Sequence, residues 1–505
     1  MYLSAILSDI VSPSVLIHKN DAETLGIKEQ SRAVLTEKNT GASAAAEVHV
    51  SEKSLQPGEI ILGSLAAEKL QAKDGDKIEI TARGVPASLK YIVKKMDNGK
   101  LTRSETAAIV KDITGGVLSP EEISPFVSAM YINGLDMDET EYLAREMIDS
   151  GEKLTFSKGP VVDKHSIGGV PGNKISLLVV PTIAAANLLI PKTCSRAITG
   201  AGGTADLMEA LAPVAFSAKE VQEMTEKAGG VIVWGGTTNI VPADDILIRY
   251  EYPLKINPRG KMLASILAKK KAAGSDICVI DIPTGPGAKV ATEEEGKILA
   301  GQLIELGKRL DMKVECALTY GGFPIGRDVG VNLEVAEALR ILEEKDGNGS
   351  LVLKSCAVAG IALEMAGTAK HGGGADAAMR LIRNGKAHQK MMDIIEIQGG
   401  DPKIKSSDLP AGEFSYAVEA PEDGYIVSIS NRPVIDIARA AGSPADHGAG
   451  IHLNRKVGEP VKKGEVLYTI YADKEWKLSK AMKIAEESRP VMVSGMLISR
   501  VTSNE

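Results

Sequence analysis

The spacing of hydrophobic positions changes along the chain, and the first region has the pattern of short strands. Within residues 1–85, two similar segments, AETLGIK from Ala22 and AEKLQAK from Ala67, are each followed by a β-type run. This pattern predicts a β-rich N-terminal module built from two related strand–helix–strand halves. Chance similarity between two short segments is the alternative.

Residues 86–160 change to short helical patterns with clear start signals. Ser119 and Asp136 each precede a glutamate by three residues, which is the pattern of a capping box at a helix N-terminus. We therefore expect a helical lobe here, with a returning segment near residues 240–270.

Residues 161–410 alternate between β-rich and helical patterns. The run Ile277–Ile282 reads as a buried strand, and Glu293–Lys308 reads as an amphipathic helix. Such alternation is typical of a parallel sheet with crossover helices. We expect a large central α/β domain that would bind phosphate.

Residues 411–505 return to strands, with a helix near Asp473–Glu487 and a final strand after it. The paired hairpins resemble the flattened barrel of carrier domains, so we expect a barrel-sandwich-like α+β domain. The predicted fold class is α/β, with a helical lobe, a large mixed α/β domain, a β-rich N-terminal module and this C-terminal domain.

Composition and charge restrict the class of protein. The 505 residues are 44% hydrophobic and 25% charged, which is ordinary for a folded globular chain. The net charge of −7 provides no overall basic field for nucleic acid. Four dispersed cysteines suggest neither a disulfide framework nor a zinc cluster. The most apolar run, Ile175 to Ile190, is too short to span a membrane. We expect a cytoplasmic protein that binds neither nucleic acid nor membrane.

The first candidate site is DKHSIGGVPGNK, residues 163–174, which lies between two apolar runs. Its glycines allow backbone N–H groups to approach an anion, while Lys164 adds charge and Ser166 adds a hydroxyl donor. The spacing matches neither a Walker loop nor a dinucleotide fingerprint. The segment predicts a phosphate cradle, with a tight structural loop as the alternative.

A second candidate cradle is TCSRAITGAGGTADLME, residues 193–209, where hydroxyls and glycines alternate before a helix expected to begin near Ala205. Ser195, Thr199 and Thr204 can donate to oxygen, and the helix start adds a favourable dipole. Arg196 can clamp a phosphate with two N–H groups. A salt bridge of Arg196 that only shapes the loop is the alternative.

These segments resemble the thymidine and pyrimidine-nucleoside phosphorylase family. The resemblance includes DKHSIGG and SRAITGAGGTADLME, and it continues through SILAKK from Ser265, IDIPTGPGAKV from Ile280 and IEIQGGDP from Ile395. The first loop is one residue longer than HSTGGVGDK, Tyr250 stands where pyrimidine enzymes have a base-binding arginine, and the N-terminal module is additional. These departures imply a branch of the family that acts on nucleoside 5′-monophosphates.

The resemblance implies an enzyme that carries out reversible phosphorolysis of AMP, and also of CMP or UMP. Orthophosphate would be the co-substrate, and the products would be a free base and ribose 1,5-bisphosphate, in nucleotide degradation that feeds RuBisCO. No organic cofactor and no required metal are implied. The implied assembly is a homodimer through the helical lobe, with higher assembly through the N-terminal module.

The resemblance also implies roles for particular residues. Those implied to bind orthophosphate are Lys164, Ser166, Ser176 and Thr204. Those implied to bind the nucleotide are Gly169, Ser195, Arg196, Ala197, Ile198, Thr199, Gly200, Ser265 and Lys289. Cys194 stands where nucleoside enzymes present a serine hydroxyl.

Asn257 stands where related enzymes place an aspartic acid that protonates the leaving base. An amide has no titrating proton near neutral pH. Either another group or water supplies the proton, or the enzyme is a slow variant, or it prefers a pyrimidine nucleotide.

Several alternatives stay open. His165 could act as a base, although a structural or ribose-side role is favoured. The pair Asp244 and Asp245 resembles the metal-binding acidic pairs of phosphoribosyltransferases, or it is a solvated helix start. The rival functions are a thymidine or pyrimidine-nucleoside phosphorylase, a magnesium-dependent phosphoribosyltransferase-like enzyme and a non-catalytic nucleotide-binding scaffold.

Overall fold

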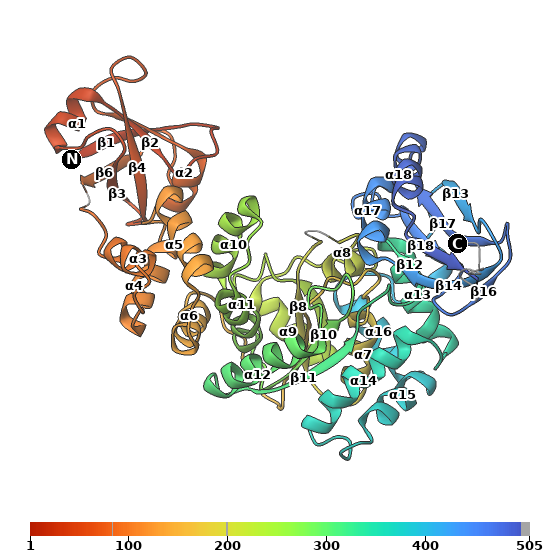
Figure 1. Cartoon of the computed structure of the whole chain (residues 1–505). Coiled ribbons are helices and arrows are strands. Elements are labelled where there is room, and N and C mark those ends of the chain that lie inside the picture. The colour runs from red at the N-terminus through yellow and green to blue at the C-terminus, as the bar shows by residue number, and fades with distance from the viewer. Residues whose placement is uncertain (83, 198–199, 496–505) are drawn as a thin grey trace, which may run out of the picture. The chain divides into compact units, whose positions relative to one another are not determined.

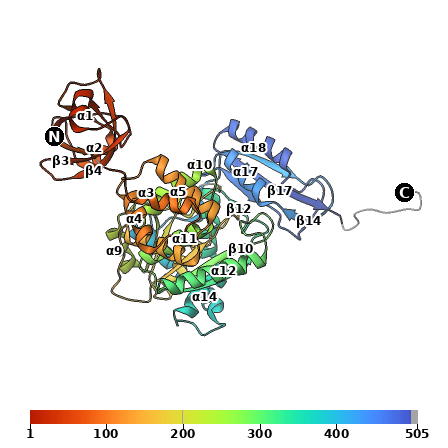
Figure 2. The ribbon, with the colours of Figure 1, turned by 60° about the vertical axis from the view of Figure 1, so that its left-hand side comes forward.

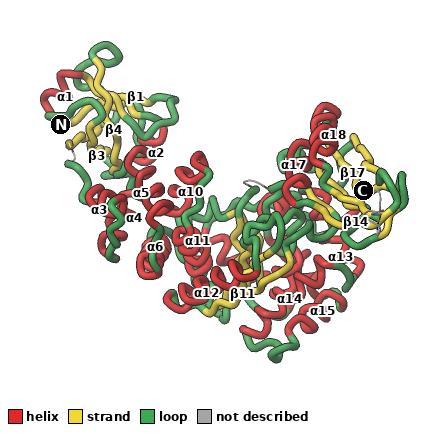
Figure 3. The backbone as a smooth tube through the Cα atoms, viewed as in Figure 1, coloured by secondary structure: helices red, strands yellow, loops and turns green. Residues whose placement is uncertain are grey.

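The computed structural model describes residues 1–82, 84–197 and 200–495 (Figure 1). The chain divides into two compact units. The first comprises Met1–Gly151 and Val241–Ser265, and the second comprises Glu152–Ile240 and Ile266–Glu505. Strands and helices alternate through most of the second unit (Figure 3).

The first unit begins with a closed barrel whose strand order is β1-β5-β2-β4-β3-β6. Leu3, Ile17, Leu35 and Ile60 are fully buried inside it. The bounds of its strands are β1 Tyr2–Leu7, β2 Val15–His18, β3 Ser31–Glu37, β4 Ser43–Ser51, β5 Glu59–Leu62 and β6 Lys77–Ala82.

The two similar segments of the N-terminal region fold into equivalent short helices. They are α1 (Lys19–Leu25), which lies between β2 and β3, and α2 (Ser64–Leu70), which lies between β5 and β6. The expected strand–helix–strand elements are therefore present in both places, while a repeat of two related halves stays a prediction.

The helices that follow make up the rest of the first unit. Glu122 accepts a hydrogen bond from the backbone nitrogen of Ser119 at 2.9 Å, and Asp136 accepts one from the backbone nitrogen of Glu139 at 2.9 Å, so both predicted helix starts are confirmed. The helices are α3 Ser88–Met96, α4 Arg103–Thr114, α5 Pro120–Asn133, α6 Met137–Asp149, α10 Pro242–Leu254 and the first turns of α11 Arg259–Ala272.

A parallel sheet forms the centre of the second unit. Strands β11, β10 and β7 pair in that order, β8 pairs with β9, and a bridge between Val161 and Leu189 connects the two groups. The strands are β7 Val162–Ser166, β8 Ile190–Cys194, β9 Gly230–Trp234, β10 Ile277–Thr284 and β11 Lys313–Tyr320. In open parallel sheets, ligands bind at the carboxyl ends of the strands. Ser166 and Cys194 are the last residues of their strands and therefore lie at that edge.

Helices cover this sheet, and their apolar side chains complete one large core with those of the strands (Figure 1). The predicted strand at Ile277–Ile282 and helix at Glu293–Lys308 are confirmed. The helices are α7 Ser176–Ala185, α8 Thr204–Glu209, α9 Ala218–Ala228, α12 Glu293–Arg309, α13 Val331–Glu344, α14 Ser350–Met365, α15 Gly374–Arg383 and α16 Lys386–Ile397.

The C-terminal part of the second unit has two small sheets and two helices, α17 (Asn431–Ala441) and α18 (Glu475–Ser488), beside strands β14 and β17 (Figure 2). The sheet orders are β12-β15-β17-β13 and β16-β14-β18. The 3₁₀ helix before them is η1 Ser406–Asp408. The strands are β12 Asp328–Val329, β13 Phe414–Glu419, β14 Gly424–Ile429, β15 Gly450–Leu453, β16 Pro460–Val461, β17 Val466–Ala472 and β18 Val491–Ser494.

One strand of this part comes from a region that the sequence pattern assigned elsewhere. Strand β12 lies within residues 161–410, yet it pairs with β15 through Asp328 and His452. A two-residue strand leaves no periodicity in the sequence, so the pattern could not reveal it. The similarity of this part to a barrel-sandwich domain stays a prediction. Across the described ranges, no helix has both the length and the apolar character needed to cross a bilayer.

Candidate active site

Buried lysines gather near the carboxyl ends of β7, β8 and β10. Lys164 lies on β7, Lys192 on β8 and Lys270 on α11, and these residues are 3%, 4% and 3% exposed. The side chain of Lys354, on α14, is 8% exposed. Because burial strongly disfavours an isolated charge, such a cluster requires negative partners.

Two fully buried aspartates supply part of the negative charge. Asp163 Oδ2 lies 2.8 Å from Lys270 Nζ, and Asp163 Oδ1 lies 3.5 Å from Lys192 Nζ. Asp281 Oδ2 lies 3.0 Å from Lys354 Nζ. Four lysines thus face two carboxylates, which leaves an excess of positive charge that a bound anion would neutralise.

Lys164 is the lysine of this cluster that has no carboxylate partner among the described residues. Its Nζ donates to Ser166 Oγ at 2.9 Å. Burial, followed by repulsion from Lys192, lowers the pKa of Lys164 to about 7. An anion placed beside Lys164 would reverse this shift and stabilise the ammonium form.

The hydroxyl of Ser166 is held between a donor and an acceptor. It accepts from Lys164 and donates to Asp281 Oδ2 at 2.8 Å, while Thr319 Oγ1 donates to Asp281 Oδ1 at 2.6 Å. Since a serine hydroxyl has a single proton, Asp281 sets its direction.

The glycine-rich loop after β7 packs closely against Lys289. Gly169 has a φ of +91°, and a Cβ at this position would lie 2.9 Å from both Cγ and the backbone nitrogen of Lys289. Glycine is therefore required for the close approach. Ser176, buried, is the first residue of α7, where free backbone N–H groups favour anions. Lys174, in the same motif, is instead committed to Glu337 at 2.5 Å.

The second predicted cradle is shaped by carboxylates that the sequence analysis did not single out. Asp206 accepts from the backbone nitrogens of Ala197 at 2.7 Å and Gly203 at 2.9 Å. Thr204 is the first residue of α8, which confirms the predicted helix start, and Ser195 is exposed. Ile198 and Thr199 lie outside the described residues.

Arg196 makes the salt bridges that the sequence left open as an alternative. Its guanidinium binds Glu209, with Nη2 to Oε1 at 2.6 Å, and its Nη1 lies 3.2 Å from Asp206 Oδ1. These carboxylates raise the pKa of Arg196, with the hydrogen bond to Glu209 as the largest cause. In this geometry both terminal nitrogens of the guanidinium already bind Glu209, so a two-point contact with phosphate would require Arg196 to release Glu209.

Two further residues near the lysines are neutral at neutral pH. Burial raises the pKa of the Cys194 thiol to about 11, and Sγ donates to the carbonyl oxygen of Val233 at 3.2 Å. Burial, together with the surrounding lysines, lowers the pKa of His165 well below 6.5. His165 therefore adds no positive charge to the cluster.

Two further predicted residues, Ser265 and Asn257, belong to the first unit. Ser265 Oγ donates to the buried Asp244 Oδ2 at 2.6 Å, and Lys261 Nζ lies 2.8 Å from Asp244 Oδ1. Asn257 is exposed, and its amide contacts Met262 Sδ at 3.4 Å. Asp244 is thus paired with a buried lysine. In the part of the chain that the structure describes, no group of three or more His, Cys, Asp and Glu side chains is placed to hold a metal ion.

Sequence reasoning missed four members of the lysine cluster and its partners: Lys192, Lys270, Asp281 and Lys354. Lys270 and Asp281 lie within the motifs SILAKK and IDIPTG, so those motifs were the available signal. Lys354 follows the helical pattern of α14 and belongs to no motif, and only the fold brings it to Asp281.

Comparison with known proteins matches three family models to the chain. The helical bundle domain of a glycosyl transferase family covers residues 89–151, and the α/β domain of a glycosyl transferase family covers residues 158–388. The pyrimidine nucleoside phosphorylase C-terminal domain covers residues 425–491.

Curated proteins match the chain along its whole length. A protein from Methanocorpusculum labreanum named AMP phosphorylase is 60% identical, with 100% of both chains covered. Another AMP phosphorylase, from Methanospirillum hungatei, is 54% identical over 99% of this chain and 97% of its own. Among solved structures, anthranilate phosphoribosyltransferase from Thermus thermophilus has a TM-score of 0.51 at 19% identity, covering 61% of this chain and 98% of its own. At that identity the likeness concerns the fold alone.

The lowered pKa of Lys164 predicts a pH-dependent affinity for anions. Sulfate stays a dianion between pH 6.5 and 8.5, so a change in its affinity reports on the protein. In the free protein Lys164 loses its proton above about pH 7. Isothermal titration calorimetry should therefore show strong sulfate binding below pH 7 and weakening by up to about tenfold per pH unit above it.

The Lys164→Gln variant provides the control for this measurement. It should bind sulfate weakly at pH 6.5 and lose most of the change between pH 6.5 and 7.5. A sulfate affinity of the unmodified protein that is constant from pH 6.5 to 8.5 would contradict the assignment of Lys164 to the anion.

Proposed function

Because the chain belongs to the AMP phosphorylase family, we propose that it cleaves AMP with orthophosphate to adenine and ribose 1,5-bisphosphate. CMP and UMP are the further substrates of this proposal. The observation that carries it is the buried lysine cluster, in which Lys164 lies beside Ser166 with no carboxylate partner among the described residues. A non-catalytic nucleotide-binding scaffold could also use this lysine, and only release of free adenine separates the two.

The chemistry places a multiply charged nucleophile beside a sugar carbon. As the glycosidic bond lengthens, C1′ becomes cationic and orthophosphate attacks it. Lys164 and Ser166 would bind and orient orthophosphate, and this positioning lowers the barrier without any covalent step on the protein. Phosphate at neutral pH is already a competent nucleophile, so no general base is required, which agrees with the neutral state of His165.

The nucleotide needs a second set of contacts for its own phosphate and ribose. We assign these to Gly169 and Lys289 and to the loop from Ser195 to Gly200, while the role of Ser265, which lies in the first unit, stays a prediction. Lys289 packs against Gly169, and Asp206 orders the loop through the backbone of Ala197 and Gly203. The homodimer, the cytoplasmic location and the supply of RuBisCO stay predictions.

The first test compares AMP with adenosine, which lacks the 5′ phosphate. Free adenine is measured by chromatography and the sugar product by ³¹P NMR, with orthophosphate present and a chelator added. Since hydrogen bonds to a charged group contribute about 1.5–3 kcal/mol each, two such contacts predict a kcat/KM for AMP at least about 100-fold above that for adenosine.

Two results of this experiment would contradict the proposal. One is adenosine reacting as well as AMP. The other is release of adenine that does not depend on orthophosphate. A requirement for magnesium would favour the phosphoribosyltransferase-like rival instead.

Asn257 provides a second test, because its amide cannot protonate the leaving adenine. General acid catalysis contributes about 10²–10⁴-fold where a donor is well placed. The Asn257→Asp variant should therefore raise kcat on AMP by about tenfold or more, as measured by steady-state release of adenine.

The Asn257→Ala variant is the matched control and should not show this gain. If Asn257→Asp leaves kcat unchanged or lowers it, position 257 is not the donor site. Parallel assays with CMP and UMP then show whether the chain prefers a pyrimidine nucleotide.

A further inference from the structure

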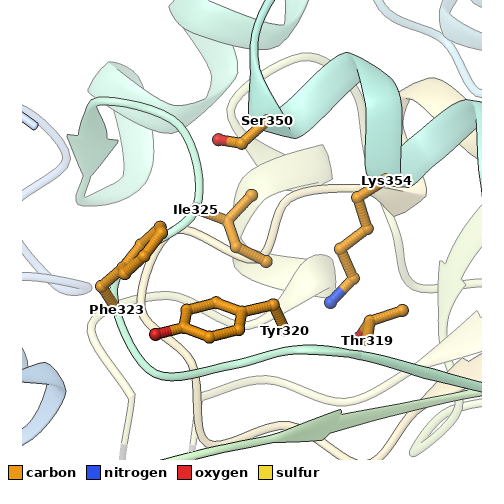
Figure 4. Close-up of a pocket in the computed structure, with 6 residues that line it drawn as sticks. All are labelled: Thr319, Tyr320, Phe323, Ile325, Ser350 and Lys354. Carbon is orange, nitrogen blue, oxygen red and sulfur yellow. The ribbon is translucent and has the colours of Figure 1, made fainter. Parts of the chain in front are cut away.

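A cavity of about 330 Å³ opens beside the lysine cluster, at the end of β11 and the start of α14. Its lining residues are Thr319, Tyr320, Phe323, Ile325, Ser350 and Lys354 (Figure 4). The rings of Tyr320 and Phe323 pack with their centroids 4.7 Å apart. The amine of Lys354 points across the cavity toward Thr319 (Figure 4). Lys354 therefore connects this cavity with the candidate site.

A chain of short contacts runs from Lys354 to Lys164. Lys354 Nζ lies 3.0 Å from Asp281 Oδ2, and the same oxygen accepts from Ser166 Oγ at 2.8 Å. Ser166 Oγ in turn accepts from Lys164 at 2.9 Å. Asp281 is thus the carboxylate at the centre of this path, and it meets an ammonium group directly on one side and through a hydroxyl on the other.

The position of Asp281 raises an electrostatic difficulty for an anion site. A fully buried carboxylate one hydroxyl away from orthophosphate would repel it, because charges interact strongly where water is excluded. It would also attract the ammonium group of Lys164, which would then be less available to pair with orthophosphate. An ion pair between Asp281 and Lys354 cancels both effects while Asp281 keeps its hydrogen bond from Ser166.

The same arrangement occurs a second time, in the first unit. Ser265, also implied to bind substrate, donates to the buried Asp244. The buried Lys261 lies 2.8 Å from that carboxylate and 3.0 Å from the buried Glu251, so two carboxylates share this lysine. In both places a serine is oriented by a buried aspartate whose charge meets a buried lysine. The likeness therefore concerns the geometry of serine, aspartate and lysine, and not the net charge, because among the described residues only in the first unit is the lysine shared with a second carboxylate.

We propose that Lys354 is a positioning residue for orthophosphate, which neutralises Asp281 so that this carboxylate orients Ser166 and leaves the charge of Lys164 for the anion. The proposal rests on the assignment of Lys164 and Ser166 to orthophosphate. In this proposal Lys354 acts through Asp281 and does not itself contact orthophosphate or the nucleotide. The cavity beside Lys354 allows the proposal to be tested with a small amine.

The first experiment measures steady-state kinetics of the Lys354→Met variant. The KM for orthophosphate should rise by about tenfold or more, equivalent to about 1.4 kcal/mol. The KM for AMP should stay within about twofold. A general loss of structure would change both constants and the melting temperature together. Lys390→Met is the matched control, since Lys390 pairs with Asp393 at 3.2 Å on α16 away from these residues, and its constants should not change.

The double variant Lys354→Met/Asp281→Asn separates charge from shape. If Lys354 acts by neutralising Asp281, removing both charges should bring the KM for orthophosphate back to within about threefold of the unmodified value. If Lys354 only fills space, the double variant should be at least as impaired as the single one. That second result would overturn the proposal.

The cavity allows a chemical rescue of the Lys354→Ala variant. Ethylammonium can enter beside Asp281, and it should lower the KM for orthophosphate in this variant but not in the unmodified protein. Ethanol, of similar size and uncharged, should have no effect. Absence of rescue together with an unchanged KM for orthophosphate in the variant would also overturn the proposal.

Two further measurements keep the outcome interpretable. If Lys354→Met does not fold, Lys354→Arg keeps the charge and should stay within about threefold of the unmodified KM, while the double variant still tests neutralisation.

Sulfate binding separates this proposal from the proposed function. A protein that releases no adenine from AMP contradicts the function, whereas equal sulfate affinity with and without Lys354 contradicts the role of Lys354.

Discussion

The buried excess of positive charge at the ends of the parallel strands is the constraint on which the site depends. Four lysines meet two aspartates in a region from which water is largely excluded. Such a cluster is stable only when each ammonium group has a carboxylate, a carbonyl oxygen or a bound anion. Lys192 shows one solution, because it also donates to the carbonyl oxygens of Lys164 and Thr193. Lys164 donates to the hydroxyl of Ser166 and has no carboxylate partner among the described residues, which is why we propose that it binds the anion.

Carboxylates orient several of the predicted binding residues, and the sequence motifs do not reveal this. Asp281 orients Ser166, Asp244 orients Ser265, and Asp206 with Glu209 orders the loop that contains Arg196. A proposed anion site that contains a buried aspartate is at first sight contradictory. The pairing of Asp281 with Lys354 resolves the contradiction, since Asp281 then acts as a hydrogen-bond acceptor with little net charge. Asp244 differs, because its lysine, Lys261, is shared with Glu251.

Much of the fold could be predicted from periodicity and end signals. The helix starts after Ser119 and Asp136, the strand from Ile277 and the helix from Glu293 depend on local contacts, and local contacts are encoded in neighbouring residues. Strand β12 could not be predicted, because two residues carry no period and their pairing partner lies far along the chain. Arg196 shows the same limit in the site, since residue type and loop composition allowed both a phosphate clamp and a salt bridge.

Residue order alone was sufficient to identify the family, because its motifs are long and keep their order from DKHSIGG to IEIQGGDP. It also indicated the glycine loop and the serines as candidates for binding an anion, since the chemistry of anion binding restricts the residue types that can serve. It could not identify the partners of those side chains. Lys354 and Ser166 are far apart along the chain and share no pattern, and their connection through Asp281 exists only because β7, β10 and α14 pack together. Electrostatic pairing in a buried site depends on distances in space, and folding is what sets those distances.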